Sequence, residues 1–270
     1  MILSGEQCRL VYPALTDLVT FIVILGVGYP LIFVFSKALK LHPQIIDIVE
    51  RKREALLCFL VLGAVIAGAF GIYGFYDRVW VRLTLTADPL YVLRDAIAIA
   101  VILLPAIVAL RWSKQTLGSI GIARKNLIKN LALGLLVGLL LILFLGVLSP
   151  FLAGGFAGFS VPTGYLLLSY IIIGFGEEII FRGYMQTRLT AYSGPVMGIG
   201  FASLFYVTYN FPLGYFCFSG DIFLASVYAI WRFSSGLLYG YTFHKSQNIF
   251  SSSILHSFVV WGGLLFGLYL

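Results

Sequence analysis

Long apolar runs separated by short polar segments dominate the chain. A helix needs about 20 residues to cross the hydrocarbon core of a bilayer, at about 1.5 Å per residue. Runs of about this length cover residues 14–37, 55–75, 92–110, 131–153, 162–182, 194–216, 221–242 and 249–270. Barrel strands would be about ten residues long and would alternate in polarity. The pattern therefore predicts an all-α polytopic membrane protein with about eight transmembrane helices.

The polar segments between the runs are too short to form a second domain, so we expect residues 1–270 to form a single integral membrane domain. The stretch 111–130 is amphipathic and basic, and is expected to lie at the cytoplasmic interface. Nearly all polar groups at membrane depth follow it. We therefore expect peripheral N-terminal helices in residues 1–110 and a four-helix core of catalytic type in the C-terminal half.

Charge separates this chain from soluble and nucleic-acid-binding proteins. Only 11% of the residues are charged, against about a quarter in an ordinary soluble domain. The net charge is +7, but the basic residues follow the loops and do not form a patch interleaved with aromatic residues, so no nucleic-acid partner is expected. Counted by runs, the odd-numbered loops carry Lys37, Lys40, Arg51, Lys52, Arg53, Arg111, Lys114, Arg124, Lys125, Lys129, Arg182, Arg188 and Lys245, whereas only the second even-numbered loop is basic. The positive-inside rule then predicts that odd loops face the cytoplasm.

Two adjacent glutamates and an arginine stand at the end of the run 162–182. Glu178 and Arg182 are four residues apart, so they share a helix face and can pair. Glu177 points about 100° away and lacks that partner, which leaves it available as a base. The plainer alternative is a solvated cytoplasmic helix end from which Arg182 snorkels. We favour the first interpretation because charges within apolar segments are costly to keep.

Arg232 stands in the middle of the run 221–242. A mid-membrane arginine is expected to pair inward. The sequence leaves open whether its partner is Asp221, through water, or a carboxylate of the core.

The segment EEIIFR at 177–182 resembles the EExxxR motif of the CAAX-protease and bacteriocin-processing (CPBP, or Abi) intramembrane protease family, which includes the prenyl-protein endopeptidase. ASLFYVTYN at 202–210 and GLLYGYTFHKSQNIFSSSILHSF at 236–258 resemble the third and fourth helices of that family. The basic stretch LGSIGIARKNLIKN resembles its usual lead-in. EExxxR alone is a weak pattern, but the motifs together, in order and at membrane depth, are more specific. The resemblance covers roughly residues 112–270 and implies a CPBP-like core there.

The resemblance also implies roles for individual residues. Glu177 would activate a water, and Glu178 with Arg182 would hold Glu177 in position. His256 would help stabilise the oxyanion. Two positions depart from the pattern: Asn210 stands where a His that helps hold the water is expected, and Val260 stands where Asn is usual. An amide can orient water but cannot exchange a proton near neutral pH, and loss of one oxyanion donor typically costs about 10²–10³ in rate.

These observations lead to three functional hypotheses. The leading one is a glutamate-dependent intramembrane endopeptidase of the CAAX prenyl-protease type, cleaving a lipidated or membrane-associated peptide near the cytoplasmic face. The alternative is a catalytically degenerate binding or scaffold protein of the same fold, motivated by Asn210 and Val260. A carboxylate-based transporter is the third, although the chain lacks matching helices interrupted by Gly and Pro.

No cofactor is expected. Zinc is chemically acceptable to a carboxylate with His256 and His244, but Asn210 removes one imidazole and no HExxH spacing exists. A water-activating glutamate without metal is therefore preferred. The expected partners are a peptide or prenylated protein substrate and the lipid bilayer, and the oligomeric state stays open. The expected location is the cell membrane, with the active site toward the cytoplasm.

Overall fold

The computed structural model describes residues 23–41, 46, 48–75, 89–148, 161–218 and 220–265. Over these residues the chain is helical and contains no strand, so the all-α prediction is confirmed. The elements are the π-helix η1 (Ile24–Gly28), α3 (Tyr29–Ala38), α4 (Arg51–Phe75), α5 (Pro89–Trp112), the 3-10 turn η3 (Leu117–Ile120), α6 (Leu127–Leu148), α7 (Val161–Glu178), the π-helix η5 (Ile179–Gln186), α8 (Thr187–Ser193), α9 (Pro195–Cys217), α10 (Ile222–Ser246) and α11 (Ile249–Leu265).

Each of the eight apolar runs contains an apolar helix. Within the described residues, six segments are long and apolar enough to cross a membrane, namely Arg51–Ile72, Val92–Trp112, Leu127–Val147, Gly164–Ser193, Pro195–Phe216 and Ile222–Ser246. The helices Ile24–Ala38 and Ile249–Gly263 are apolar but shorter, and the outer ends of their runs lie outside the described residues. The protein is therefore a polytopic membrane protein.

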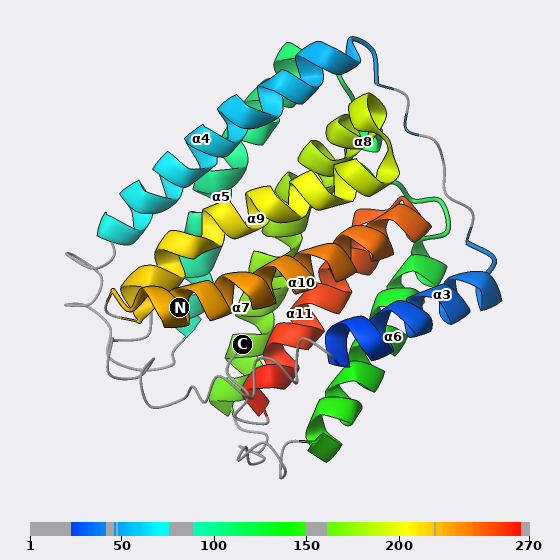
Figure 1. Ribbon diagram of the computed structural model, residues 1–270, viewed down its shortest axis with the longest axis vertical. Helices are drawn as coiled ribbons and strands as arrows, with labels where there is room; N and C mark the ends of the chain where they lie inside the picture. The colour runs from blue at the N-terminus through cyan, green and yellow to red at the C-terminus, as the bar shows by residue number, and fades with distance from the viewer. Residues whose placement is uncertain are drawn as a thin grey trace.

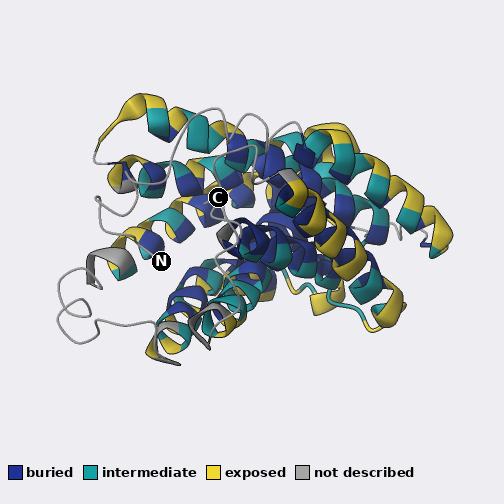
Figure 2. Cartoon of the chain, turned by 90° about the horizontal axis from the view of Figure 1, so that it is seen from below, coloured by how far each residue is buried: buried dark blue, intermediate teal, exposed yellow. Residues whose placement is uncertain are grey.

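The helices form two apolar groups that meet at the centre of the molecule. The first cluster joins α4, α5, η5 and α9, and the second joins α3, α6, α10 and α11. In Figure 1, α4 and α5 lie along one side of the bundle and α3 and α6 along the other, with α9, α10 and α11 between them. Figure 2 shows the buried residues gathered in the interior and the exposed ones on the outer helices. Large apolar side chains such as Leu60 and Leu143 are exposed there, as a surface in contact with lipid requires.

Glycine lets α6 approach α11 closely. A Cβ atom added at Gly134 would lie 2.4 Å from the backbone oxygen of Ser251, and one added at Gly138 would lie 2.9 Å from the side chain of Phe258. On the other side of the contact, a Cβ atom at Gly262 would lie 2.3 Å from Ile142. Small residues at such contacts are typical of packing between membrane helices.

The placement of Arg182 and Arg188 in a cytoplasmic loop is wrong. The helix that was expected to end at residue 182 continues through η5 and α8 to Ser193, and both arginine side chains are fully buried within it. The chain stays helical because buried acids compensate both charges: Nε of Arg182 lies 3.5 Å from Glu178 and Nε of Arg188 lies 3.3 Å from Glu54. The solvated helix end is excluded for the same reason.

Arg188 also ties the lead-in segment to the helix that carries the acidic pair. Its guanidinium donates hydrogen bonds to Oε1 of Gln115 at 2.6 Å, to Oγ1 of Thr187 at 2.8 Å and to the carbonyl oxygen of Tyr184 at 3.1 Å. Together with Glu54, these contacts join α4, the segment before η3 and α8. This network fixes the end of the helix that positions the candidate site.

Candidate functional site

The acidic pair lies where an α-helix changes into a π-helix. Glu177 and Glu178 are the last residues of α7, and Arg182 belongs to η5. A π-helix has wider turns than an α-helix, and such segments occur often at functional sites. The structure confirms the expected ion pair, with 3.5 Å between Nε of Arg182 and Oε2 of Glu178 and neither side chain exposed.

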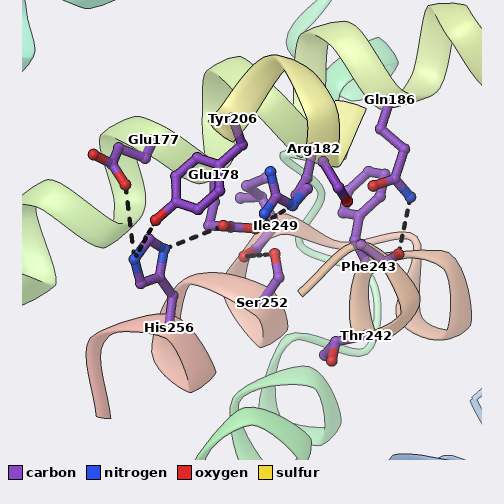
Figure 3. A network of polar contacts seen from close by, with 12 residues as sticks. Glu177, Glu178, Arg182, Gln186, Tyr206, Thr242, Phe243, Ile249, Ser252 and His256 are labelled. Atoms are coloured by element: carbon purple, nitrogen blue, oxygen red, sulfur yellow. Dashed lines mark hydrogen bonds and ion pairs between the residues drawn. The ribbon is translucent and has the colours of Figure 1, made fainter. Parts of the chain in front are cut away.

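Both glutamates meet a single imidazole on α11. Nδ1 of His256 lies 3.2 Å from Oε1 of Glu178, and its Nε2 lies 3.7 Å from Oε2 of Glu177. Figure 3 shows the two carboxylates reaching His256 from α7 on opposite sides of the ring. The side chain of His256 is buried, as are those of both glutamates. The structure therefore brings together Glu177, Glu178, Arg182 and His256.

Two tyrosines enclose the ring of His256. Tyr239 of α10 stacks on it, with ring centroids 4.4 Å apart and an interplanar angle of 17°. Tyr206 of α9 meets it edge-on, and the Tyr206 hydroxyl lies 3.4 Å from Nε2. Tyr206 belongs to the first apolar cluster and Tyr239 to the second, so the site lies where the two clusters meet. The imidazole is thereby held by Tyr239 on one face, by Tyr206 edge-on, and by contacts at both nitrogens.

Arg232 reaches the same group through Tyr206. Its Nη1 donates to the hydroxyl of Tyr206 at 2.9 Å, and its Nε donates to the hydroxyl of Tyr228 at 2.8 Å. The guanidinium also lies over the rings of Tyr228 and Trp231. Arg232 makes no ion pair with a carboxylate in the part of the chain that the structure describes.

Asp221 is not the partner of Arg232. It is the N-cap of α10, where its Oδ1 accepts hydrogen bonds from the backbone amides of Phe223 and Leu224. This contact satisfies amides that would otherwise lack a partner at the helix start. Eleven residues of helix, about 16 Å at 1.5 Å per residue, separate Asp221 from Arg232.

Asn210 is buried but turns back onto its own helix. Its Nδ2 donates to the carbonyl oxygen of Tyr206 at 2.8 Å. Among the described contacts, none joins the Asn210 side chain to Glu177, Glu178 or His256. The polar atom that α9 presents to the imidazole is the hydroxyl of Tyr206, one helical turn earlier.

Unpartnered polar atoms gather in this region. Several buried atoms form no hydrogen bond: the three guanidinium nitrogens of Arg182, Oε2 of Glu177 and Oε2 of Glu178. The contact between Arg182 and Glu178 is an ion pair at 3.5 Å and does not count as a hydrogen bond. Oε1 of Gln186 and Oγ of Ser253 are likewise buried without a hydrogen bond. Buried polar atoms are nearly always paired in native proteins, so these are the atoms free to bind a water molecule or polar atoms of a substrate.

The described residues contain no group of three or more His, Cys, Asp or Glu side chains arranged to hold a metal ion. His244, the second histidine weighed as a zinc ligand, forms no side-chain hydrogen bond or ion pair with His256 or the glutamates among these residues. The arrangement is therefore that of two inequivalent carboxylates facing one imidazole.

Sequence reasoning missed the contribution of Tyr206 and the partner of Arg232. The sequence contains only weak indications of these contacts. Arg232 is a charge in the middle of an apolar run, and Tyr206 stands one helical turn before Asn210. Neither observation identifies a contact between α9 and α10.

Residues 159–262 match the family model described as type II CAAX prenyl endopeptidase Rce1-like. The match includes α7 to α10 and most of α11, and therefore every residue of the group around His256. The comparisons with curated proteins and with solved structures found no match.

Proposed function

We propose that the protein is a glutamate-dependent endopeptidase. The premise is that residues 159–262 belong to the Rce1-like family of type II CAAX prenyl endopeptidases, within the CPBP intramembrane proteases. The substrate would be a lipidated or membrane-associated peptide. The observation that carries the proposal is the meeting of Glu177, Glu178 and Arg182 with His256 inside a membrane helix bundle.

In the proposed reaction, Glu177 is the general base. It takes a proton from a water molecule while the water oxygen attacks the carbonyl carbon of the scissile peptide bond, whose π electron pair moves onto the carbonyl oxygen. When the tetrahedral intermediate collapses, the carbonyl re-forms, the carbon–nitrogen bond breaks, and the proton on Glu177 passes to the leaving amine. Positioned general acid–base catalysis of this kind typically contributes about 10²–10⁴ in rate.

The surrounding contacts support different roles for the two glutamates. Oε2 of Glu178 lies 3.5 Å from the guanidinium of Arg182, without a hydrogen bond, and its Oε1 lies 3.2 Å from Nδ1 of His256, so the charge of Glu178 is compensated by a cation. Oε2 of Glu177 has no hydrogen-bond partner and lies 3.7 Å from Nε2 of His256, close enough for both atoms to contact one water molecule. Glu178, paired with Arg182, thus holds the imidazole through Nδ1, and Glu177 faces the water on the Nε2 side.

The bilayer is the second expected partner. Cleavage within a helix bundle excludes bulk water from the intermediate and strengthens its electrostatic interactions with the protein. The basic residues Arg51, Lys52 and Arg53 at the start of α4 support placing that end of the bundle toward the cytoplasm. We place the activity at the cell membrane on the cytoplasmic side.

A catalytically degenerate scaffold protein is the second candidate. It is favoured by Asn210, whose amide is bonded to its own helix, and by Val260, which offers an apolar side chain one turn after His256. A scaffold would retain the fold and a binding partner but would not cleave peptides.

The test is a cleavage assay in liposomes that contain the purified protein. Prenylated and unmodified forms of the same C-terminal peptides are supplied, and products are identified by mass spectrometry. The proposal expects cleavage by the wild type and loss of cleavage in Glu177→Gln. Glu50→Gln is the control, because Glu50 is an exposed glutamate paired with Arg53 at the start of α4, outside the site and its supporting network. Cleavage that is equal in wild type and Glu177→Gln, or absent for every peptide, would overturn the proposal.

A further inference from the structure

Arg232 is a half-buried arginine in the middle of α10 that the proposed reaction does not use. It lies eleven residues into α10, within the segment Ile222–Ser246 that is long enough to span a membrane. The other arginines of the interior, Arg182 and Arg188, each have a glutamate partner, whereas Arg232 has two tyrosine hydroxyls. An arginine at membrane depth that pairs with no acid among the described residues is costly to keep, and this favours a functional role.

The directions of the hydrogen bonds define a continuous chain. A guanidinium only donates, so the Tyr206 oxygen accepts from Arg232 and its O–H remains free to donate. At the other end, the carboxylate of Glu178 accepts, so Nδ1 of His256 carries the hydrogen on that side. Nε2 of the neutral ring is then an acceptor, and the Tyr206 hydroxyl lies 3.4 Å from it. Arg232 donates to Tyr206, Tyr206 to His256, and His256 to Glu178.

This chain changes what His256 can do on the side that faces Glu177. With its hydrogen on Nδ1, the neutral imidazole has no hydrogen on Nε2 to offer a developing oxyanion. The nearest hydrogen on that side belongs to the hydroxyl of Tyr206, which Arg232 holds in place. We propose that Tyr206, held by Arg232, is a further catalytic residue: its single O–H leaves Nε2 of His256 and donates to the oxyanion as the negative charge forms there. This inference rests on the proposed peptidase function.

The charges of the site agree with this assignment. Glu178 is balanced by Arg182 directly, whereas Glu177 contacts Nε2 of His256, the atom that the Tyr206 hydroxyl also approaches. As Glu177 takes the proton from water, the negative charge moves from its carboxylate to the carbonyl oxygen of the substrate. That oxygen would form beside Tyr206, whose own oxygen is bonded to the positive Arg232. The cation is in place before the reaction, and only the Tyr206 hydrogen has to turn from Nε2 to the oxyanion.

The chain offers a matched pair of variants. Tyr206 and Tyr228 each accept one hydrogen bond from Arg232, but only Tyr206 contacts His256. Changing either residue to phenylalanine keeps the ring, including the packing of Tyr206 on Phe181, and removes one hydroxyl. Each variant therefore removes one hydrogen bond of Arg232, but only Tyr206→Phe also removes the contact with His256.

The kinetic test measures kcat and KM for a prenylated peptide in liposomes. Removing an oxyanion donor typically lowers kcat by about 10²–10³, and kcat/KM falls by the same factor because the interaction forms only in the transition state. We expect this for Tyr206→Phe, with KM unchanged, whereas Tyr228→Phe keeps most of the wild-type kcat. A kcat of Tyr206→Phe equal to that of Tyr228→Phe, or a change in KM alone, overturns the inference.

A spectroscopic test does not depend on turnover. The chain contains only three histidines, so a ¹⁵N-histidine spectrum in detergent is simple, and His256→Gln identifies the signals of His256. We expect the Nε2 signal of His256 to shift in Tyr206→Phe and to stay in place in Tyr228→Phe. An unchanged signal in Tyr206→Phe overturns the hydrogen-bond chain. If the wild type cleaves nothing while the signal still depends on Tyr206, the proposed peptidase function fails and the hydrogen-bond chain stands.

Discussion

Glu178 binds His256 and Arg182 through different oxygens: Oε1 lies 3.2 Å from Nδ1 of His256, and Oε2 lies 3.5 Å from Nε of Arg182. One carboxylate therefore connects the π-helix η5 to α11. This relationship explains why two adjacent glutamates in one helix are not equivalent. Glu178 is held between a cation and an imidazole, whereas Oε2 of Glu177 has no hydrogen-bond partner and lies 3.7 Å from Nε2.

Removing Arg182 should destabilise the fold more than removing the whole ion pair. Arg182→Met leaves the buried carboxylate of Glu178 without its cation, and loss of one partner of a buried pair typically costs about 3–5 kcal/mol. The double variant Glu178→Gln/Arg182→Met leaves no uncompensated charge and should recover much of that loss. Thermal unfolding of the purified proteins in detergent measures both. A double variant less stable than Arg182→Met would contradict this account of the pair.

Close packing of α6 on α11 should make Gly134 intolerant of even a methyl group. The added Cβ atom would lie 2.4 Å from a backbone oxygen of α11, which cannot rotate away, and overpacking typically costs about 1–3 kcal/mol. Gly63→Ala is the control, because no atom lies within 4 Å of a Cβ atom there. We expect a lower unfolding temperature for Gly134→Ala only. Equal unfolding temperatures for the two variants would show that the helices are not in such close contact.

Restoring the imidazole that the family pattern has at position 210 should raise activity. The amide of Asn210 is bonded to the carbonyl of Tyr206, so it contributes no contact to His256. An imidazole can both hold water and exchange a proton near neutral pH. We expect Asn210→His, alone or with Val260→Asn, to increase the rate of peptide cleavage in liposomes. A rate that does not change in either variant would remove the main argument for the degenerate scaffold protein.

Chelators should leave peptide cleavage unchanged. The proposed base is a carboxylate, and the described residues hold no arrangement of three metal-ligating side chains. We expect equal rates before and after treatment with a strong chelator, together with substoichiometric zinc in the purified protein. Loss of activity that returns on addition of zinc would replace the base mechanism by a metal-dependent one.

Much of this architecture follows from the sequence. The apolar runs predicted the helices because a segment without polar interruptions must satisfy its backbone internally within a bilayer. The four-residue spacing predicted the contact between Glu178 and Arg182, which is local to one helix. Residues 159–262 match the Rce1-like family model, which agrees with the resemblance that the EEIIFR motif indicated.

Contacts between helices could not be predicted in the same way. His256 meets Glu178 across 78 residues of sequence, and only the family resemblance suggested that they lie together. The link from Arg232 to Tyr206 depends on how α10 packs against α9, which no spacing encodes. Arg182 and Arg188 were misplaced because charges usually mark the end of a membrane helix, and the acids that compensate them become visible only in the fold.

In the proposed reaction, Glu177 activates the water that cleaves a membrane-bound peptide. The most direct measurement compares cleavage of a prenylated peptide by wild type and Glu177→Gln in liposomes, at equal amounts of folded protein. We expect the wild type to release the C-terminal fragment and the variant to be slower by about 10² or more. Equal rates for the two proteins, or no cleavage by the wild type, would contradict this role of Glu177.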